Sequence, residues 1–150
     1  EETMQIPLAI AGPGISPGSV CNQLVTSMDL APTVLALCDI AAPHPLHGKS
    51  LRGLLVGPDS ADQPLRAGLM TQHYGLNEHI VQRGFYQGDH KLIVQADRFV
   101  ELYDLRQDPS EMNNLAKRQI ETPLVKRMSD ALSREMLEVG DDGAGGQIAD

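Results

Sequence analysis

Five histidines are the side chains of this chain most suited to binding a metal ion. They occur as two spaced pairs and one single residue: His44 and His47, His73 and His79, and His90. The first pair lies in a proline-rich turn, and the second pair spans a loop that contains a glycine. Neither pair has a cysteine or carboxylate at a spacing that metal sites use. The sequence therefore predicts no metal site built within this chain.

Motifs for nucleophilic catalysis are also absent. The chain has no G-x-S-x-G turn, no H-E-x-x-H pair and no cysteine with an evident base. Cys21 and Cys38 could form one disulfide, but two separate thiols are the better interpretation, with Cys38 buried near the end of an apolar helix. The sequence indicates neither their redox state nor a redox compartment. No catalytic residue is predicted.

The acids of "ELYDLRQDPSEMNNLA", Glu101 to Ala116, are the remaining candidates for acid or base catalysis. One aspartate precedes a proline, where aspartate commonly begins a turn, and the residues that follow can cap a short helical segment. We therefore predict turn and capping roles at the end of a strand for four residues: Asp104, Asp108, Glu111 and Asn114. On the same grounds, Asp29 is predicted to cap a helix rather than to act as an acid.

Three short elements are expected in the first third of the chain. The apolar run Ile6–Ile10 predicts a strand, and the glycines and prolines after it predict a wide turn. "SMDLAPTVLALCDI" predicts a helix that Ser27 or Asp29 caps and that tolerates Pro32 in its first turn. "LHGKSLRGLLVG" predicts a short helical turn.

From Leu69 onward the pattern changes to short β-rich runs, which are GLMTQ, HIVQRGFY, HKLIVQ and FVELYDL. Short loops with glycine or aspartate separate the last three, as in antiparallel hairpins. Thr122 and Pro123 predict the start of a helix whose apolar residues recur at helical spacing and which Gly140 ends. We predict the α+β class, with a small antiparallel sheet of about four strands packed on a C-terminal helix.

Size and charge narrow the possible partners. The chain has 150 residues, which suits one compact domain, and a formal net charge of -8. This acidic balance argues against a nucleic-acid backbone or an anionic membrane surface as a partner. No apolar run approaches the ~20 residues of a membrane span, and no signal segment opens the chain.

Four phrases stand in order along the chain: IPLAIAGPGI, LVTSMDLAPTVLALCDIAAP, LHGKSLRGLL and ELYDLRQDPSEMNNLA. Together they resemble the C-terminal third of the formylglycine-dependent sulfatases, of the alkaline-phosphatase-like superfamily. The resemblance implies that residues 1–57 are a strand, a helix and a short helix at the end of a large α/β domain. Residues 58–64 would be a linker loop, 65–139 a C-terminal subdomain and 140–150 a disordered tail.

The resemblance also implies where the chemistry takes place. In that family the large domain holds a formylglycine nucleophile, made from a Cys/Ser-x-Pro-x-Arg signature, and a calcium ion bound by Asp and Asn side chains. No cysteine or serine of this chain begins that signature, since Cys21 precedes Asn-Gln-Leu and Cys38 precedes Asp-Ile-Ala. The acidic pairs that bind calcium are absent too. We therefore expect the nucleophile and metal site in a longer parent protein, and an isolated chain without activity.

Partners follow from the same resemblance. The missing N-terminal sulfatase domain is the expected partner, a sulfated small molecule or glycan is the expected substrate of the parent, and the isolated chain is expected to expose apolar surface and self-associate. In the family, loops of the C-terminal subdomain border the pocket. His73, His79 and Arg83 are therefore candidates to donate hydrogen bonds to an anionic sugar. The alternative for each is an exposed loop or strand-edge residue without a substrate.

Two further functions remain open from the sequence. The parent could be a phosphodiesterase or phosphonate hydrolase of the same superfamily, because the C-terminal subdomain does not identify the atom attacked. The chain could instead be a stand-alone binding or assembly module. A Cys/Ser-x-Pro-x-Arg signature encoded upstream of Glu1 would favour the sulfatase. A periplasmic or secreted location is suggested by family habit alone.

Overall fold

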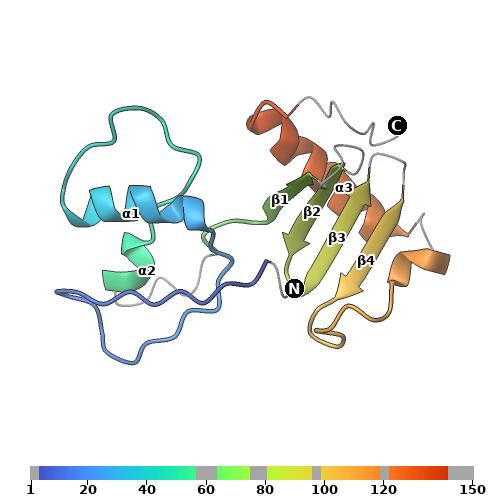
Figure 1. Cartoon of the computed structure of the whole chain (residues 1–150), viewed down its shortest axis with the longest axis horizontal. Helices are drawn as coiled ribbons and strands as arrows, with labels where there is room; N and C mark the ends of the chain where they lie inside the picture. Colours follow the sequence, from blue (N-terminus) through green and yellow to red (C-terminus); the bar gives the residue numbers. More distant parts are fainter. Residues whose placement is uncertain (1–3, 57–63, 75–80, 96–98, 119–121, 142–150) are drawn as a thin grey trace. The chain divides into compact units, whose positions relative to one another are not determined.

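The computed structural model describes residues 4–56, 64–74, 81–95, 99–118 and 122–141 (Figure 1). The chain divides into two compact units rather than the single domain that its length suits. The helical unit comprises Ile6–Arg66, and the sheet unit comprises Ala67–Asp150 together with Glu1–Gln5. The linker expected at 58–64 and the tail expected at 140–150 lie mostly outside the described residues.

Three short helices form the regular part of the helical unit. They are η1 (Ser27–Asp29), α1 (Leu30–Leu37) and α2 (Arg52–Val56). Pro32 lies in the first turn of α1, where the missing N–H removes no intrahelical hydrogen bond. Just past the end of α1, Asp39 takes a left-handed conformation, with φ of 54°. The structure therefore has both helical segments that the sequence predicts here.

The prediction of a strand over Ile6–Ile10 is wrong, because these residues have no regular secondary structure. A β-strand needs a neighbouring strand to take up its backbone N–H and C=O groups. Among the described residues of the helical unit, no strand is present to pair with this segment. Its apolar side chains are consequently left open, with Ile6 66% and Leu8 46% exposed.

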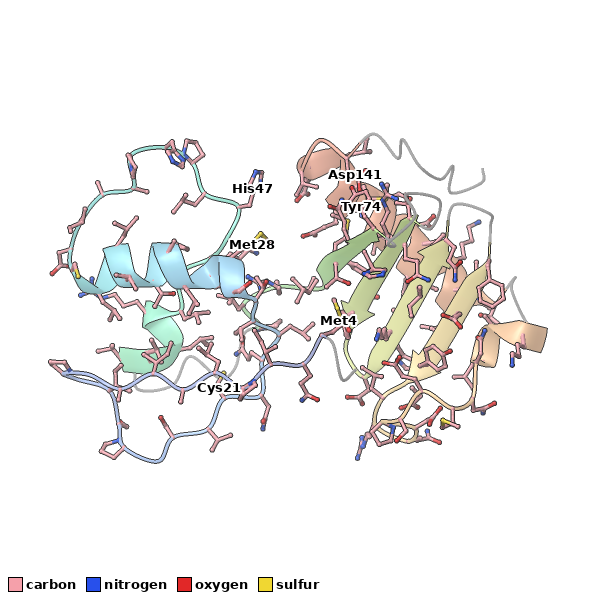
Figure 2. The ribbon with its side chains drawn as sticks, in the orientation of Figure 1. Met4, Cys21, Met28, His47, Tyr74 and Asp141 are labelled. Carbon is pink, nitrogen blue, oxygen red and sulfur yellow. The ribbon has the colours of Figure 1, made fainter. Side chains whose placement is uncertain are left out.

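The prediction of a buried thiol at Cys38 is also wrong, because this residue is exposed at the C-terminal end of α1. Cys21, labelled in Figure 2, is exposed as well, and both residues are free thiols. The outer surface of α1 explains the error. Val34, one turn before Cys38, is 59% exposed, so the helical unit does not cover every apolar residue of this helix.

Four antiparallel strands form the sheet unit, in the order β1-β2-β3-β4. Their bounds are β1 Leu69–Tyr74, β2 Val81–Gln87, β3 His90–Gln95 and β4 Val100–Asp104. Because consecutive strands are neighbours, the sheet is a meander, as predicted (Figure 1). Gly88 makes the turn between β2 and β3 with φ of 58°, a left-handed value that glycine adopts without strain.

The predicted C-terminal helix is α3 (Pro123–Glu138), which covers one face of the sheet (Figure 1). Thr122 caps it: the threonine hydroxyl accepts a hydrogen bond from the Val125 N–H at 3.2 Å, and a proline follows in the first turn. Among the described residues, no helix is long and apolar enough to cross a membrane.

The core of the sheet unit lies between α3 and the sheet. The helix contributes residues three or four positions apart, which share one face: Val125, Met128, Leu132 and Met136. The strands contribute the residues that alternate toward the helix: Phe85, Leu92, Val94 and Leu102. This is the α+β packing that the two periodicities predict.

The opposite face of the sheet carries a row of aromatic and charged residues. The strand register places Lys91 between Tyr86 and Tyr103. These three residues are buried, although their chemistry is not that of an apolar core. The segment after β4 covers part of this row, because Glu111 in that segment forms an ion pair with Lys91.

Candidate functional site

Asp29 is the polar centre of the helical unit and has no exposed surface. Thr26 and Asp29 bracket η1 in a capping box, in which the Thr26 N–H donates to Asp29 Oδ2 at 2.9 Å. The sequence predicts Ser27 or Asp29 as the cap. Asp29 does occupy the cap position of α1, although its side chain bonds no N–H group of that helix's first turn. Thr26 is the cap residue of η1, and the Asp29 carboxylate closes the box around η1.

The Asp29 carboxylate also binds two distant segments. Its Oδ1 accepts hydrogen bonds of 2.7 Å from the Lys49 N–H and from the Arg66 guanidinium. The side chains of Asp29 and Arg66 are 0% and 8% exposed, so their contact is a buried ion pair. One carboxylate therefore holds together the start of η1, the segment before α2 and the end of the unit.

A second series of contacts fastens α1 to the segment before α2. The Thr33 hydroxyl donates to the Asp29 carbonyl and accepts a hydrogen bond from the Leu51 N–H at 2.8 Å. Gly48 approaches η1 so closely that a Cβ at this position would lie 1.9 Å from the Met28 carbonyl oxygen. The glycine of "LHGKSL" is therefore required by its contact with "SMDL".

The ionisation of Asp29 follows from these contacts. Burial raises the pKa of Asp29, but hydrogen bonds from the Arg66 side chain and from the Lys49 and Thr26 N–H groups outweigh it, leaving the pKa below the ordinary 3.8. The carboxylate is ionised at neutral pH, and both of its oxygens are engaged. A general acid needs a proton to donate and a pKa near the working pH. Asp29 is accordingly a structural anchor.

In the sheet unit, "ELYDLRQDPSEMNNLA" reverses the chain after β4. Asp104 Oδ1 accepts hydrogen bonds of 3.0 and 3.1 Å from two backbone N–H groups just after it. Asp108 accepts hydrogen bonds from the N–H groups of Met112 and Asn113, at 3.1 and 2.8 Å. Both aspartates have the turn and capping roles predicted from the sequence.

Asn114 closes the outer edge of β4. Its Oδ1 accepts a hydrogen bond from the Leu102 N–H at 3.1 Å, and its Nδ2 donates to the Val100 carbonyl at 3.2 Å. Oδ1 also accepts the Ala116 N–H at 2.8 Å, within η3 (Leu115–Arg118). The side-chain amide therefore takes the place of a neighbouring strand, which leaves fewer backbone groups of this edge open to another chain.

The sequence predicts a turn or capping role for Glu111 but not its main contact, which is an ion pair with Lys91. Its side chain reaches the face of the sheet opposite α3 and binds Lys91 Nζ at 2.7 Å. The Glu111 φ of 55° is left-handed, a conformation that costs free energy in a residue with a side chain. The ion pair explains why the chain adopts it. The Lys91 ammonium also lies 5.3 Å from the centre of the Tyr86 ring, a cation–π distance.

Tyr103 completes this row. Its hydroxyl donates a hydrogen bond to Glu101 Oε1 at 3.0 Å. Burial and this hydrogen bond to a carboxylate raise the pKa of Tyr103 to about 12. The hydroxyl therefore stays protonated at neutral pH, acting as a donor and not as a base.

The three residues predicted to face a substrate pocket have different positions. His73 lies on the edge strand β1 and is exposed. Arg83 on β2 is 3% exposed and donates from two nitrogens to the Asp141 carboxylate, at 2.7 and 2.8 Å. The register places Gln72 opposite Arg83, so the His73 and Arg83 side chains point to opposite faces of the sheet. His79 lies outside the described residues.

The described residues contain no group of three His, Cys, Asp or Glu side chains that could hold a metal ion. Calcium takes about six to eight oxygen ligands. The carboxylates of Asp29, Asp104 and Asp108 instead accept hydrogen bonds from backbone N–H groups. These oxygens do not fit the calcium ion expected of a parent enzyme.

Comparisons with known proteins agree with one another. The family described as "N-sulphoglucosamine sulphohydrolase, C-terminal" matches residues 1–138. The chain is 32% identical to arylsulfatase K of Xenopus laevis over 126 residues, covering 77% of this chain and 23% of that protein. It is 33% identical to an N-acetylglucosamine-6-O-sulfatase of Bacteroides thetaiotaomicron over 122 residues, covering 77% and 22%. A solved 2-O GAG sulfatase superposes with a TM-score of 0.74 at 27% identity, covering 88% of this chain and 29% of that one.

The chain therefore belongs to the sulfatase family and corresponds to the C-terminal portion of a sulfatase. Its matched region spans less than a quarter of each of the two curated relatives. Two of the four phrases that resemble the sulfatases contain the anchors described above, since Asp29 lies in LVTSMDLAPTVLALCDIAAP and Asn114 in ELYDLRQDPSEMNNLA. These phrases therefore include residues that hold the fold.

Replacing Asp29 with asparagine should destabilise the helical unit. Asp29→Asn leaves the Arg66 guanidinium buried without its carboxylate, so we expect the free energy of unfolding of this unit to fall by about 3 kcal/mol. Urea denaturation followed by circular dichroism at 222 nm measures the change. The matched control is Asp39→Asn, because Asp39 pairs with Arg52 at the surface, where both side chains are at least 48% exposed. That control should change stability by about 0–1 kcal/mol.

The stability that Asp29 contributes should depend on pH in a direction set by its lowered pKa. Because the Asp29 pKa is lowered in the folded state, its contribution is fully present above the ordinary value of 3.8 and is lost as pH falls through the folded-state value. The difference between wild type and Asp29→Asn should therefore shrink below about pH 4. Equal destabilisation by Asp29→Asn and Asp39→Asn would contradict the anchor role.

Removing the Asn114 amide should destabilise the sheet unit. Asn114→Ala leaves the buried Leu102 and Ala116 N–H groups without an acceptor, so we expect a loss of about 2–3 kcal/mol. Tyrosine fluorescence during urea denaturation reports on this unit, because all three tyrosines lie in it. Asn113→Ala is the matched control, since the Asn113 side chain is exposed. If Asn114→Ala unfolded at the same urea concentration as the control, the amide would not be closing the β4 edge.

Proposed function

We propose that this chain is the C-terminal part of a sulfatase that hydrolyses a sulfate ester or a sulfamate, and that the chain is inactive alone. One observation carries the proposal. Residues 1–138 match a sulfatase C-terminal family, and the matched region makes up less than a quarter of the curated relatives. The remaining three quarters of such an enzyme are the expected place for the catalytic groups.

The aspartates that hold the fold of this chain contribute to that reaction only through structure. In the complete enzyme, formylglycine would supply the nucleophile and calcium would stabilise the charge that develops on the sulfate. Three aspartates are engaged in the fold: Asp29 holds the helical unit, and Asp104 and Asp108 hold the turn after β4. They keep the C-terminal portion in a fixed shape beside the active site.

The exposed apolar residues of the helical unit support a partner surface. Among the described residues of this unit, five large apolar side chains are more than half exposed: Ile6, Val20, Met28, Val34 and Ile40. Soluble monomers rarely leave many such residues uncovered together. We propose that the N-terminal sulfatase domain covers them in the complete protein and pairs with residues 6–10. In its absence, the isolated chain self-associates through the same residues.

The substrate of the complete enzyme is proposed to be a sulfated sugar. One relative is named for a sulfated amino sugar and one solved structure for glycosaminoglycan sulfate. His73 is exposed on β1, and an imidazole can donate a strong hydrogen bond to a sulfate oxygen or a weaker one to a sugar hydroxyl. We assign it to substrate contact. His79 stays a candidate for the same role, and the buried Arg83 would act by positioning.

The isolated chain should not hydrolyse sulfate esters. We expect no release of 4-methylumbelliferone from 4-methylumbelliferyl sulfate above the buffer rate, because the nucleophile and metal belong to another part of the enzyme. Fluorescence measures the release, and the complete enzyme is the positive control. Turnover by the pure chain that disappeared on mutating one of its own residues would contradict the proposal. A complete enzyme that cleaved bis-4-nitrophenyl phosphate but no sulfate ester would contradict the reaction class.

Replacing His73 in the complete enzyme should weaken substrate binding. We expect His73→Ala to raise KM for a sulfated monosaccharide by about tenfold and to leave kcat nearly unchanged, because one hydrogen bond to a charged group is lost. Initial-rate kinetics measure both constants. His90→Ala is the matched control, since His90 lies at the opposite end of the sheet, at the start of β3. The same KM for both variants would remove His73 from the substrate site.

A further inference from the structure

The C-terminal end of α3 directs one acidic side chain toward the sheet. Gly140 follows the helix with φ of 72° and donates its N–H to the Leu137 carbonyl at 3.3 Å. The next residue, Asp141, donates its N–H to the Met136 carbonyl at 2.8 Å. These two bonds form the Schellman motif, which reverses the chain at a helix end. Asp141 therefore belongs to the folded helix end and not to the disordered tail predicted from residue 140.

Three donors from two strands converge on the Asp141 carboxylate. Arg83 Nε and one terminal nitrogen of its guanidinium donate to the two oxygens, at 2.7 and 2.8 Å. Gln72 Nε2 donates to Oδ2 at 2.6 Å. Gln72 on β1 and Arg83 on β2 are directly opposite in the strand register. Figure 2 shows Asp141 at the end of β1 where Tyr74 lies.

An aspartate is an unexpected residue at this position. The position after the glycine of a Schellman motif usually carries an apolar side chain that contacts the helix. The C-terminal end of a helix also has a partial negative charge, which disfavours a carboxylate. Here the side chains of Arg83 and Asp141 are only 4% and 8% exposed. Removing one partner of a buried ion pair leaves the other charge buried without compensation, so the pair ties the end of α3 to β2.

The strand that this carboxylate reaches is otherwise weakly held. β1 is the edge of the sheet, with β2 as its one neighbour in the described sheet. Its second half, Gln72 to Tyr74, is exposed. An exposed edge strand opens more readily than the central strands. The bond from Gln72 to Asp141 therefore joins the exposed half of β1 to the end of α3.

We propose that Asp141 is a positioning residue for β1. Through Gln72 and Arg83 it holds the exposed half of this strand in register with β2, and so keeps His73 at a fixed place on the sheet. The role assigned to His73 in substrate binding rests on the function proposed above. The positioning of β1 does not depend on it.

Amide hydrogen exchange of the 150-residue chain, resolved by NMR, tests this proposal. In Asp141→Asn, we expect the β1 amides bonded to β2 to exchange about tenfold faster or more, and to be accelerated more than the amides of Leu92 and Val94 on β3. Asp130→Asn, at an exposed position on α3, is the matched control and should change neither strand. Unchanged exchange in β1, or equal acceleration in β1 and β3, would overturn the proposal.

A second variant covers the case in which Asp141→Asn does not fold. Gln72→Ala changes an exposed residue and removes only the β1 contact, so faster exchange should be confined to β1. If β1 keeps its protection in Gln72→Ala, the proposal fails. In the complete enzyme, Asp141→Asn should raise KM with little change in kcat, and should add nothing when His73 is already alanine. Faster β1 exchange without a change in KM would overturn the substrate role of His73 and leave the positioning of β1 intact.

Discussion

Each unit of this chain depends on a buried side-chain oxygen that accepts hydrogen bonds from backbone N–H groups. These N–H groups lie where no neighbouring helix or strand supplies an acceptor. In the described part of the helical unit, Leu51 is the one buried apolar side chain, whereas Asp29 and Thr33 are buried polar ones. In the sheet unit, Asn114 satisfies the edge of β4. A buried N–H group left unpaired costs about 1–3 kcal/mol, so these few acceptors determine whether the short elements can pack at all.

The same constraint gives structural roles to two acids that could look catalytic in the sequence. Asp29 is ionised, buried and bonded on both oxygens, and Asp108 binds the backbone just after it. A carboxylate whose two oxygens both accept hydrogen bonds from the chain itself is poorly placed to act on a substrate. The sequence phrases that resemble the sulfatases therefore contain residues whose hydrogen bonds stabilise the C-terminal portion. The reactive groups of the enzyme that we propose belong to the part outside this chain.

Periodic features of the fold could be predicted from the sequence, and long-range polar contacts could not. The meander and α3 follow from alternation, short turns and a threonine–proline start, which are local signals. The pairs Asp29–Arg66 and Lys91–Glu111 join residues 37 and 20 positions apart, and no local pattern marks them. The strand expected at residues 6–10 and the burial expected of Cys38 fail for a different reason, because both need neighbours that the described part of the chain does not supply. The role of Asp141 has one local sign in the sequence, which is an acidic residue directly after the glycine that ends the helix.

Residue-resolved amide hydrogen exchange of the unaltered chain tests the central claim most directly. The Lys49 N–H, bonded to Asp29, and the Leu102 N–H, bonded to Asn114, lie outside any helix or inner ladder position. If side-chain oxygens hold the two units together, the Leu102 amide should be protected as strongly as the amides of β2 and β3, and the Lys49 amide should exchange only when the helical unit unfolds. Exchange of both amides at the rate of an unstructured peptide, while β2 and β3 stay protected, would contradict the account.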